Sequence, residues 1–281
     1  MKTPVYPCIL FDGNAKEAAE FYAETFNEAV VDSVTPLVVM LSIKGKKFMC
    51  LNGGPKVKPN PSISFFNICT SSDELESSWR QLTEKGTVMM PLDTYPWSSK
   101  YGWVQDQYGV SWQLMEVNEQ NPVAEFFPSL MFAGEYNGRA KEAISFYTSL
   151  FDNASVQQLA TYGAGEGDKE GNVKYAELLL DDCKLTVMES SMAHNFQFDL
   201  GVSLVITCDT QQEIDRFWDA FTLNGQASRC GWCRDQFGVW WQVVPAKLSA
   251  LMTDPEKAPR VMEAFLKMTK FDLAAIERAA E

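Results

Sequence analysis

The sequence predicts an α+β fold in which one domain occurs twice and is followed by a helical extension. The first observation is an internal repeat: GWVQDQYGVSWQ at 102–113 returns as GWCRDQFGVWWQ at 231–242. A repeat of this length between segments of unbiased composition indicates a duplication and therefore sets the architecture. The second observation is that each copy alternates short apolar strands with amphipathic helices, in the order of two βαβββ units.

The correspondence extends over most of the chain. PCILFDGNAKEAAEFYAETF at 7–26 aligns with PSLMFAGEYNGRAKEAISFYTSLF at 128–151, which contains a four-residue insertion. The segment 63–86 aligns in the same way with 202–225. We therefore divide the chain into a first domain (1–117), a linker (118–125), a second domain (126–245) and a C-terminal helical extension (246–281).

The first unit opens with an apolar strand, Cys8–Phe11, that leads into a helix over 15–26. Asn14 is the expected N-cap, because Glu17 follows three residues later in the pattern of a capping box. Apolar residues then recur on one face of the helix. The expected strands that complete the unit are 30–35, 37–44 and 46–52.

The second unit begins with a strand over Ile63–Cys69. Its helix opens with Ser71 and Glu74 as a capping pair and ends at Gly86. The expected strands that follow are 87–90, 101–105 and 111–117, with a loop at 91–102. We expect the two units of each copy to form one cupped sheet. The second copy differs in its loops, with a longer hairpin at 163–172 and a shorter connection at 226–230.

The C-terminal segment is expected to be helical. Asp254 followed by Pro255 is a good helix start, and a last helix is expected at about 272–280. Between them lies an apolar stripe that must be buried, either against the two domains or against a second chain. A homodimer is therefore one expectation.

Composition excludes several classes of protein. Of the 281 residues 46% are hydrophobic and 12% aromatic, which is typical of a folded globular protein. The formal net charge of −13 argues against nucleic acid as a partner, since such binding needs clustered Lys and Arg. No run of eighteen apolar residues and no signal-peptide pattern is present, so we expect no membrane contact. Seven scattered cysteines in apolar runs indicate a reducing, cytoplasmic location.

The repeated opening FDGNAKEAAEFY and the closing DQYGVSWQ or DQFGVWWQ resemble the PhnB-like branch of the vicinal oxygen chelate superfamily. That superfamily also contains glyoxalase I, bleomycin-resistance proteins and extradiol dioxygenases. Many PhnB-like proteins carry the label 3-demethylubiquinone-9 3-methyltransferase domain. The resemblance covers about 5–245 and implies tandem glyoxalase/bleomycin-resistance-like domains, each made of two βαβββ modules.

Catalytic members of the superfamily hold a divalent metal with His and Glu side chains from the first and last strands of a module. The resemblance places the corresponding positions at or near Gln113, Gln242, Tyr6, Phe127, Ser64 and Ser203. Amides and hydroxyls are poor ligands beside carboxylate and imidazole, so we predict no metal and no cofactor. The glycine-rich turn and the later acidic residue of a conventional S-adenosylmethionine site are not found either.

Five tryptophans have two interpretations. Trp97 lies in the loop at 91–102, whereas Trp103, Trp112, Trp232 and Trp241 recur in register. They either line an aromatic ligand cavity or pack in the core. Strand alternation places Trp112 and Gln113 on opposite faces of the sheet, so at most one of the two can meet a cavity.

Asp106 and Asp235 are each followed by glycine three residues later, which is typical of a β-turn in which Asp bonds the turn backbone. The alternative for these two residues is a general base. Cys230 and Cys233 form a C-x-x-C that enters a strand, a context unlike a redox or zinc site.

Glu189 is a ligand-grade carboxylate at a strand end, and its plain alternative is a solvated turn residue. His194, the chain's single histidine, lies in a predicted loop.

The leading functional hypothesis is a metal-free protein that binds an unidentified small molecule in a cupped-sheet cavity, and it names no catalytic residue. The expected ligand-binding residues are Gln113, Gln242, Tyr6, Ser64, Ser203, Trp97, Trp103 and Trp232. One alternative is an enzyme, either a metal-dependent lyase or isomerase or the methyltransferase of the family label. A second alternative is a structural or interaction protein whose cavities are filled by its own side chains.

Overall fold

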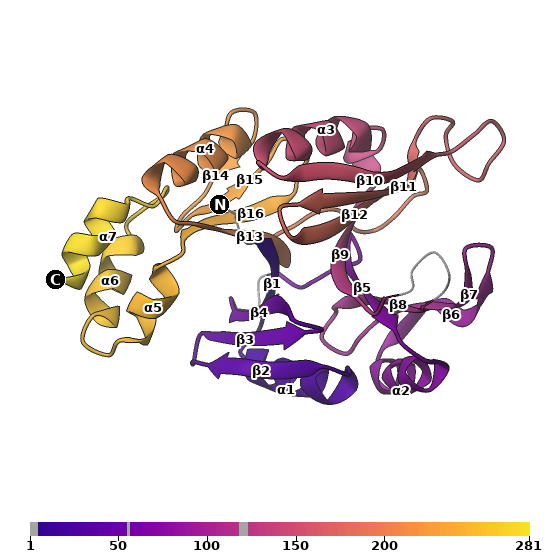
Figure 1. Ribbon diagram of the computed structural model, residues 1–281, viewed down its shortest axis with the longest axis horizontal. Helices are drawn as coiled ribbons and strands as arrows, with labels where there is room; N and C mark the ends of the chain where they lie inside the picture. Colours follow the sequence, from indigo (N-terminus) through magenta and orange to yellow (C-terminus); the bar gives the residue numbers. More distant parts are fainter. Residues whose placement is uncertain (1–4, 55–56, 118–122) are drawn as a thin grey trace.

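The computed structural model describes residues 5–54, 57–117 and 123–281 (Figure 1). The segment 118–122, which forms most of the expected linker, lies outside these residues. Four βαβββ modules are present, as the sequence predicts, and three α-helices follow them. No helix among the described residues combines the length and hydropathy needed to cross a bilayer.

The first half contains two modules. The first consists of β1 (Val5–Phe11), α1 (Ala15–Thr25), β2 (Ala29–Val34), β3 (Val38–Ile43) and β4 (Lys46–Asn52). The second consists of β5 (Ile63–Cys69), α2 (Ser72–Thr83), β6 (Thr87–Tyr95), β7 (Ser98–Gln105) and β8 (Ser111–Glu116). The expected loop at 91–102 is instead the tip of the long β6–β7 hairpin, because bulged pairing continues to Tyr95 and Ser98.

The second half repeats this order. Its modules are β9 (Phe126–Phe132), α3 (Ala140–Leu150), β10 (Ala154–Thr161), β11 (Val173–Leu180) and β12 (Cys183–Glu189), then β13 (Val202–Cys208), α4 (Gln211–Thr222), β14 (Gln226–Ala227), β15 (Trp232–Arg234) and β16 (Trp240–Pro245). A short 3₁₀ turn, Gly134–Tyr136, lies in the insertion before α3.

Strand pairing crosses the two halves. One eight-stranded sheet has the order β14-β15-β16-β13-β1-β4-β3-β2, and the other has the order β10-β11-β12-β9-β5-β8-β7-β6. The first therefore joins the first and last modules, and the second joins the two middle modules. The expectation that the two modules of one half form one sheet is wrong. Sequence repeats reveal modules but not their pairing, which depends on contacts between β1 and β13 and between β5 and β9.

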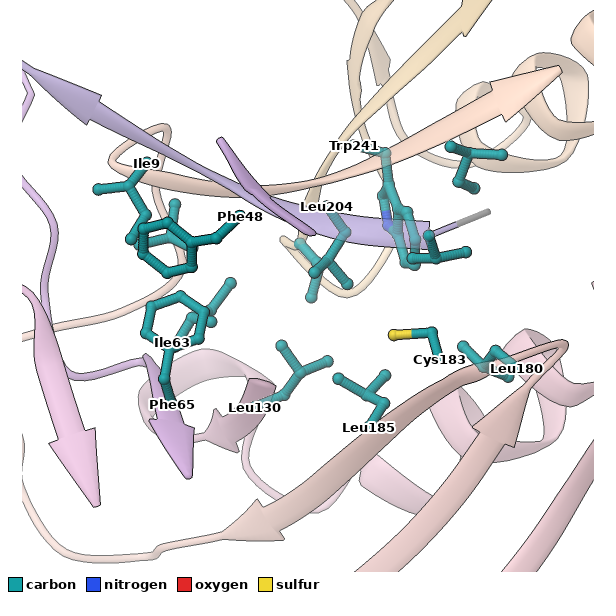
Figure 2. Packing of buried hydrophobic residues seen from close by; sticks show 14 of the residues in the cluster. Ile9, Phe48, Ile63, Phe65, Leu130, Leu180, Cys183, Leu185, Leu204 and Trp241 are labelled. Carbon is teal, nitrogen blue, oxygen red and sulfur yellow. The ribbon is translucent and has the colours of Figure 1, made fainter. Parts of the chain in front are cut away.

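The main core lies between the two sheets. Figure 2 shows side chains of one sheet, among them Phe48 and Trp241, directed toward those of the other, among them Phe65 and Leu185. Alternate strand residues point to the opposite face of each sheet. Phe65, for example, lies in the main core, whereas the next residue, Phe66, belongs to a separate hydrophobic cluster on the other face. Each sheet thus has an inner face in this core and an outer face.

The start of α1 shows how a sequence expectation can miss a long-range partner. Asn14 occupies the N-cap position but makes no side-chain capping bond. The backbone N–H of Ala15 instead donates to Oδ1 of Asn52, at the end of β4, at 3.0 Å. In α2 the expected pair is present: Ser71 Oγ accepts from the Glu74 backbone N–H, while Glu74 accepts from the Thr70 backbone N–H.

The C-terminal extension packs on the second half of the same chain, beside α4 (Figure 1). It contains α5 (Leu248–Thr253), α6 (Ala258–Phe265) and α7 (Leu273–Ala280). The backbone N–H of Cys230 donates to the carbonyl oxygen of Met268 at 2.9 Å, so the segment between α6 and α7 runs along the start of β15. Val261 and Ile276 are fully buried against their own chain, whereas Met262 is 37% exposed, so the chain itself covers only part of the apolar stripe.

Candidate functional site

Two outer sheet faces carry the residues that the sequence singles out. The β5/β9 face is defined by the floor residues Gln113, Ser64, Ser129 and Thr186, one from each of β8, β5, β9 and β12. The β1/β13 face is defined by the repeat-equivalent residues Gln242, Ser203, Cys8 and Met49, from β16, β13, β1 and β4. In each face these four strands are neighbours at the centre of the sheet.

The β5/β9 face has a polar floor. Gln113 Nε2 donates to Ser64 Oγ at 2.7 Å, and the Tyr101 hydroxyl donates to Gln113 Oε1 at 2.5 Å. Ser129 lies opposite Ser64 in the strand register, and its Oγ, although buried, has no hydrogen-bond partner among the residues that the structure describes. Thr186 is next in line and donates to a backbone carbonyl of β9 at 3.5 Å. Burial of a hydroxyl without a hydrogen-bond partner lowers the stability of the fold. Ser129 can therefore supply a hydrogen bond to a ligand.

Flexible and aromatic side chains cover this floor. Phe66, Phe127, Met115 and Met188 belong to the hydrophobic cluster of the face, together with Tyr101. Gln113, at 2% exposure, is therefore shielded from solvent. Methionine side chains adopt alternative rotamers at low cost, which makes such a covering adaptable.

An aromatic group stands at the edge of the β5/β9 face. Tyr95 and Trp97 stack with centroids 5.1 Å apart, and both meet Tyr101 edge to face at 5.5 and 5.7 Å. Trp97 is 55% exposed at the tip of the β6–β7 hairpin. Trp103 pairs with Gln113 in the strand register and donates from Nε1 to an Oγ of β8 at 2.7 Å.

The β1/β13 face keeps the glutamine and the first serine of the floor but has no hydroxyl at the other two positions. Gln242 Nε2 donates to Ser203 Oγ at 3.1 Å, and Ser203 Oγ donates to the Cys8 carbonyl oxygen at 3.5 Å. Cys8 and Met49 replace the hydroxyls of Ser129 and Thr186. Burial raises the pKa of the Cys8 thiol to about 12, although hydrogen bonds from the glutamine and serine oppose this. Cys8 therefore remains a thiol and is no nucleophile.

The flanks of the β1/β13 face differ as well. Trp232 pairs with Gln242 as Trp103 pairs with Gln113, but the neighbouring edge strand β14 is only two residues long. The position of Tyr101 is taken by Cys230. Tyr6 belongs to the hydrophobic cluster of this face, beside Met40 and Met49. The structure thus distributes the expected ligand-binding residues over two separate faces.

The aspartate that both copies of the repeat motif share is the centre of a buried hydrogen-bond cluster, called the hub below. Asp106 Oδ1 accepts from the backbone N–H groups of Tyr108 and Val110, and Oδ2 accepts from Tyr22 Oη and Trp112 Nε1, both at 2.8 Å. The turn interpretation is correct, with Gly109 at φ +87. The hub also ties α1, on one sheet, to β8, on the other.

The second half repeats this hub. Asp235 Oδ2 accepts from Tyr147 Oη and Trp241 Nε1, both at 2.8 Å, and Oδ1 accepts from two turn N–H groups. Burial raises the pKa of both aspartates to about 6, even though the four donors favour the charged form. Because donors occupy both oxygens and the carboxyls are buried, neither aspartate can act as a general base on a substrate. Trp112 and Trp241 are core residues.

The remaining candidates are structural too. Glu189 is 3% exposed, so the solvated-turn interpretation is wrong. Its Oε1 accepts from the backbone N–H groups of Gly138 and Ala140 at the start of α3, as Asn52 does for α1. His194 lies in a loop and contacts Ser190 Oγ at 2.8 Å.

Cys230 and Cys233 are free thiols at the start of β15. No group of three or more His, Cys, Asp or Glu side chains within the described ranges could hold a metal ion.

Comparison with known proteins identifies the family. The family model described as 3-demethylubiquinone-9 3-methyltransferase matches twice, over residues 3–115 and 124–244. The chain belongs to this family. A putative 3-demethylubiquinone-9 3-methyltransferase, the PhnB protein of Bacillus cereus, is 29% identical over 42% of this chain and 98% of its own, with a TM-score of 0.36.

Glyoxalase I from Zea mays is 13% identical over 90% of this chain and 97% of its own, with a TM-score of 0.59. This likeness shows the fold: two tandem glyoxalase-like domains of the α+β class. Among curated protein sequences none matches the chain.

A divalent metal ion, as in catalytic members of the superfamily, and S-adenosylmethionine, as the family label implies, do not fit the residues present. The two floors offer amide, hydroxyl, thiol and thioether groups, with no carboxylate or imidazole, which suits neither a hard nor a borderline divalent ion. The strand-to-helix turn after β1 contains one glycine, Gly13, and the first N–H of α1 is already bonded to Asn52. The turn thus lacks the open donors of a conventional S-adenosylmethionine site.

Proposed function

We propose that this 3-demethylubiquinone-9 3-methyltransferase family member binds a small organic molecule on its β5/β9 face, without metal. The observation that carries the proposal is the unpartnered Ser129 hydroxyl, buried beside the Gln113–Ser64–Tyr101 network. A ligand atom that bonds this hydroxyl would relieve a polar group that the fold leaves unpaired. Seven free thiols, mostly buried, support a cytoplasmic location for this function.

The covering side chains suit a partly apolar ligand. Phe127, Phe66 and Met188 would form apolar walls, and Trp97 would provide an exposed aromatic surface at the rim. Ligand sites in proteins combine such walls with a few polar groups that fix orientation. Binding would displace Met115 or Met188 from the floor, a change that methionine permits at low cost.

A second candidate function follows from the burial of the same floor. Gln113, Ser64 and Ser129 are at most 2% exposed, which is what a face filled by its own side chains requires. In that case the chain is a structural or interaction protein. The unpaired hydroxyl of Ser129 favours the ligand, because a permanently filled face would gain stability from an apolar residue there.

Two measurements on protein purified without chelators test the proposal. Elemental analysis should find divalent metal well below one ion per chain, and native mass spectrometry should find an organic molecule bound to the chain. A full complement of zinc, nickel, manganese or iron would overturn the metal-free function. Absence of an organic adduct, together with no thermal stabilisation by a small-molecule library, would favour the structural alternative.

A further inference from the structure

A separate cleft lies where the two halves of the chain meet. It has a volume of about 320 Å³ and lies between β1 and the β3–β4 turn of one sheet and β9 and the β11–β12 turn of the other. Its lining consists of Val5, Tyr6, Pro7, Gly45, Lys46, Lys47, Phe126, Pro128, Asp182, Cys183 and Lys184. This volume is at the lower end of the range for small-ligand sites.

Both halves contribute the same positions of the repeat to this cleft. Pro7 corresponds to Pro128, and Lys47 corresponds to Lys184. Each of these lysines lies over an aromatic ring of its own half. Lys47 Nζ is 5.8 Å from the Tyr6 ring centroid, and Lys184 Nζ is 4.7 Å from the Phe127 ring centroid. The duplication thus places the ammonium groups of Lys47 and Lys184 at one opening, and of the two rings beneath them only that of Tyr6 lines it.

The three lysines of the cleft differ in whether their ammonium groups already form ion pairs. Lys184 is held by Glu125 at 2.6 Å and by Glu177 at 3.0 Å, so its charge is already compensated. Lys46 Nζ donates to the backbone carbonyl of Asp182 at 3.0 Å, and the acidic side chain of that residue is exposed. No carboxylate within the described ranges lies within 4 Å of Lys46 or Lys47.

Apart from the exposed Asp182 and Gly45, the rest of the lining is mainly apolar. Tyr6, Phe126 and the two prolines present carbon surface, and the prolines have no backbone N–H to donate. Recognition of an anion in the cleft therefore depends on the lysine side chains, whose attraction must exceed the repulsion from the Asp182 carboxylate. In a protein with a net charge of −13, two ammonium groups without an ion pair beside one cleft are a local exception, even with Asp182 nearby.

We propose that this cleft binds a small organic anion, a carboxylate or sulfonate with an aromatic or aliphatic body. The anionic group contacts Lys46 and Lys47, and the body lies between Tyr6 and Phe126. None of the four floor residues of the β5/β9 face lines this cleft. Because its walls come from both sheets, the bound anion bridges the two halves and stabilises the native state by mass action.

The probe for this site is 8-anilinonaphthalene-1-sulfonate, titrated into the full chain by fluorescence and calorimetry. We expect one molecule per chain, with affinity that falls in about 0.5 M NaCl because salt screens exposed charges. The double variant Lys46→Gln/Lys47→Gln should weaken binding about tenfold through loss of charge-assisted contacts. The matched control Lys141→Gln/Lys169→Gln changes the net charge equally at exposed lysines elsewhere and should bind as the wild type does.

An uncharged analogue separates anion recognition from apolar adhesion. N-Phenyl-1-naphthylamine lacks the sulfonate, so its binding should not respond to the Lys46→Gln/Lys47→Gln change. The proposal is overturned if the sulfonate does not bind the wild type, if both double variants bind it equally, or if the uncharged analogue loses affinity to the same extent. The variant Gln113→Leu should leave sulfonate binding unchanged, which distinguishes this site from the β5/β9 face.

Discussion

The β5/β9 and β1/β13 faces place a glutamine and a serine at the same two positions of their sheets and differ at the next two. Ser129 and Thr186 of the first face correspond to Cys8 and Met49 of the second. The first face has an unpaired hydroxyl, whereas on the second the Gln242–Ser203 pair contacts Cys8. The duplication has therefore kept one framework and allowed its two outer faces to diverge.

The inner framework shows the opposite behaviour. Asp106 and Asp235 each accept hydrogen bonds from a tyrosine and a tryptophan at 2.8 Å, with the same two turn N–H groups completing the set. Each hub joins the two sheets within one half, while each sheet joins the two halves. Removal of one half would therefore break the pairing in both sheets but leave the hub of the other half intact.

Removal of either aspartate should have the largest effect on stability. Asp106→Ala leaves the hydroxyl of Tyr22 and the indole N–H of Trp112 buried without an acceptor. We expect a loss of about 3–5 kcal/mol in the free energy of unfolding, measured by urea denaturation. Asp235→Ala should cost the same within about 1 kcal/mol, because its contacts are identical. A loss below about 1 kcal/mol for one of them would contradict the equivalence of the two hubs.

The pH dependence of stability should report both hubs at once. Burial raises the pKa of Asp106 and Asp235 to about 6 in the folded chain, and the pKa of an unfolded aspartate is about 4. The folded state therefore binds more protons between these values, so this contribution to the unfolding free energy falls as pH rises from about 4 to about 6. The upper limit is about 3 kcal/mol for each carboxyl.

Urea titrations at several pH values check this slope against Asp106→Asn and Asp235→Asn. Each substitution should remove about half of the decline. An unchanged slope in both variants would mean that other groups cause it.

Two serines on the same floor should respond in opposite directions. Ser129→Ala removes a buried hydroxyl without a partner and should raise the free energy of unfolding by about 1 kcal/mol. Ser64→Ala removes the acceptor of Gln113 and should lower it by about 1 kcal/mol. Ser203→Ala, the matched change on the β1/β13 face, should behave like Ser64→Ala. If Ser129→Ala destabilises the chain, its hydroxyl has a structural partner and the functional argument weakens.

The smallest stability effect is expected at Trp97. The side chain is 55% exposed, so Trp97→Ala should change the free energy of unfolding by less than about 0.5 kcal/mol. Its loss should nevertheless reduce retention of a co-purified ligand, as seen by native mass spectrometry. Full retention would show that the aromatic edge of the β5/β9 face takes no part in binding.

The sequence predicts the modules well because their signals are local. Strand Ile63–Cys69 is a short apolar run, and helix α2 has an N-cap and apolar periodicity within a few residues. The pairing of modules across the halves has no local signal, since the contact of Cys8 with Ser203 joins residues far apart in the chain. The same limit hid Ser129: its register partner Ser64 could be identified only after β5 was known to pair with β9.

Side chains with two plausible roles were also decided by distant contacts. The sequence offers Glu189 as a ligand or a solvated carboxylate. It instead accepts from the backbone N–H of Ala140, the first residue of α3, and from that of Gly138 just before the helix. Its counterpart Asn52 does the same for α1. Alignment of the two copies pairs these residues. Their shared role as acceptors becomes evident only when the ends of β4 and β12 are seen to lie beside the starts of α1 and α3.

The divergence of the two faces is tested most directly by native mass spectrometry of a matched pair of variants. Gln113→Leu and Gln242→Leu make the same change at the same repeat position, one on each face. We predict one organic molecule per chain in the wild type, its loss in Gln113→Leu and its full retention in Gln242→Leu. Equal loss in both variants, retention in Gln113→Leu, or a wild type without any bound molecule would contradict the assignment of the ligand to the β5/β9 face.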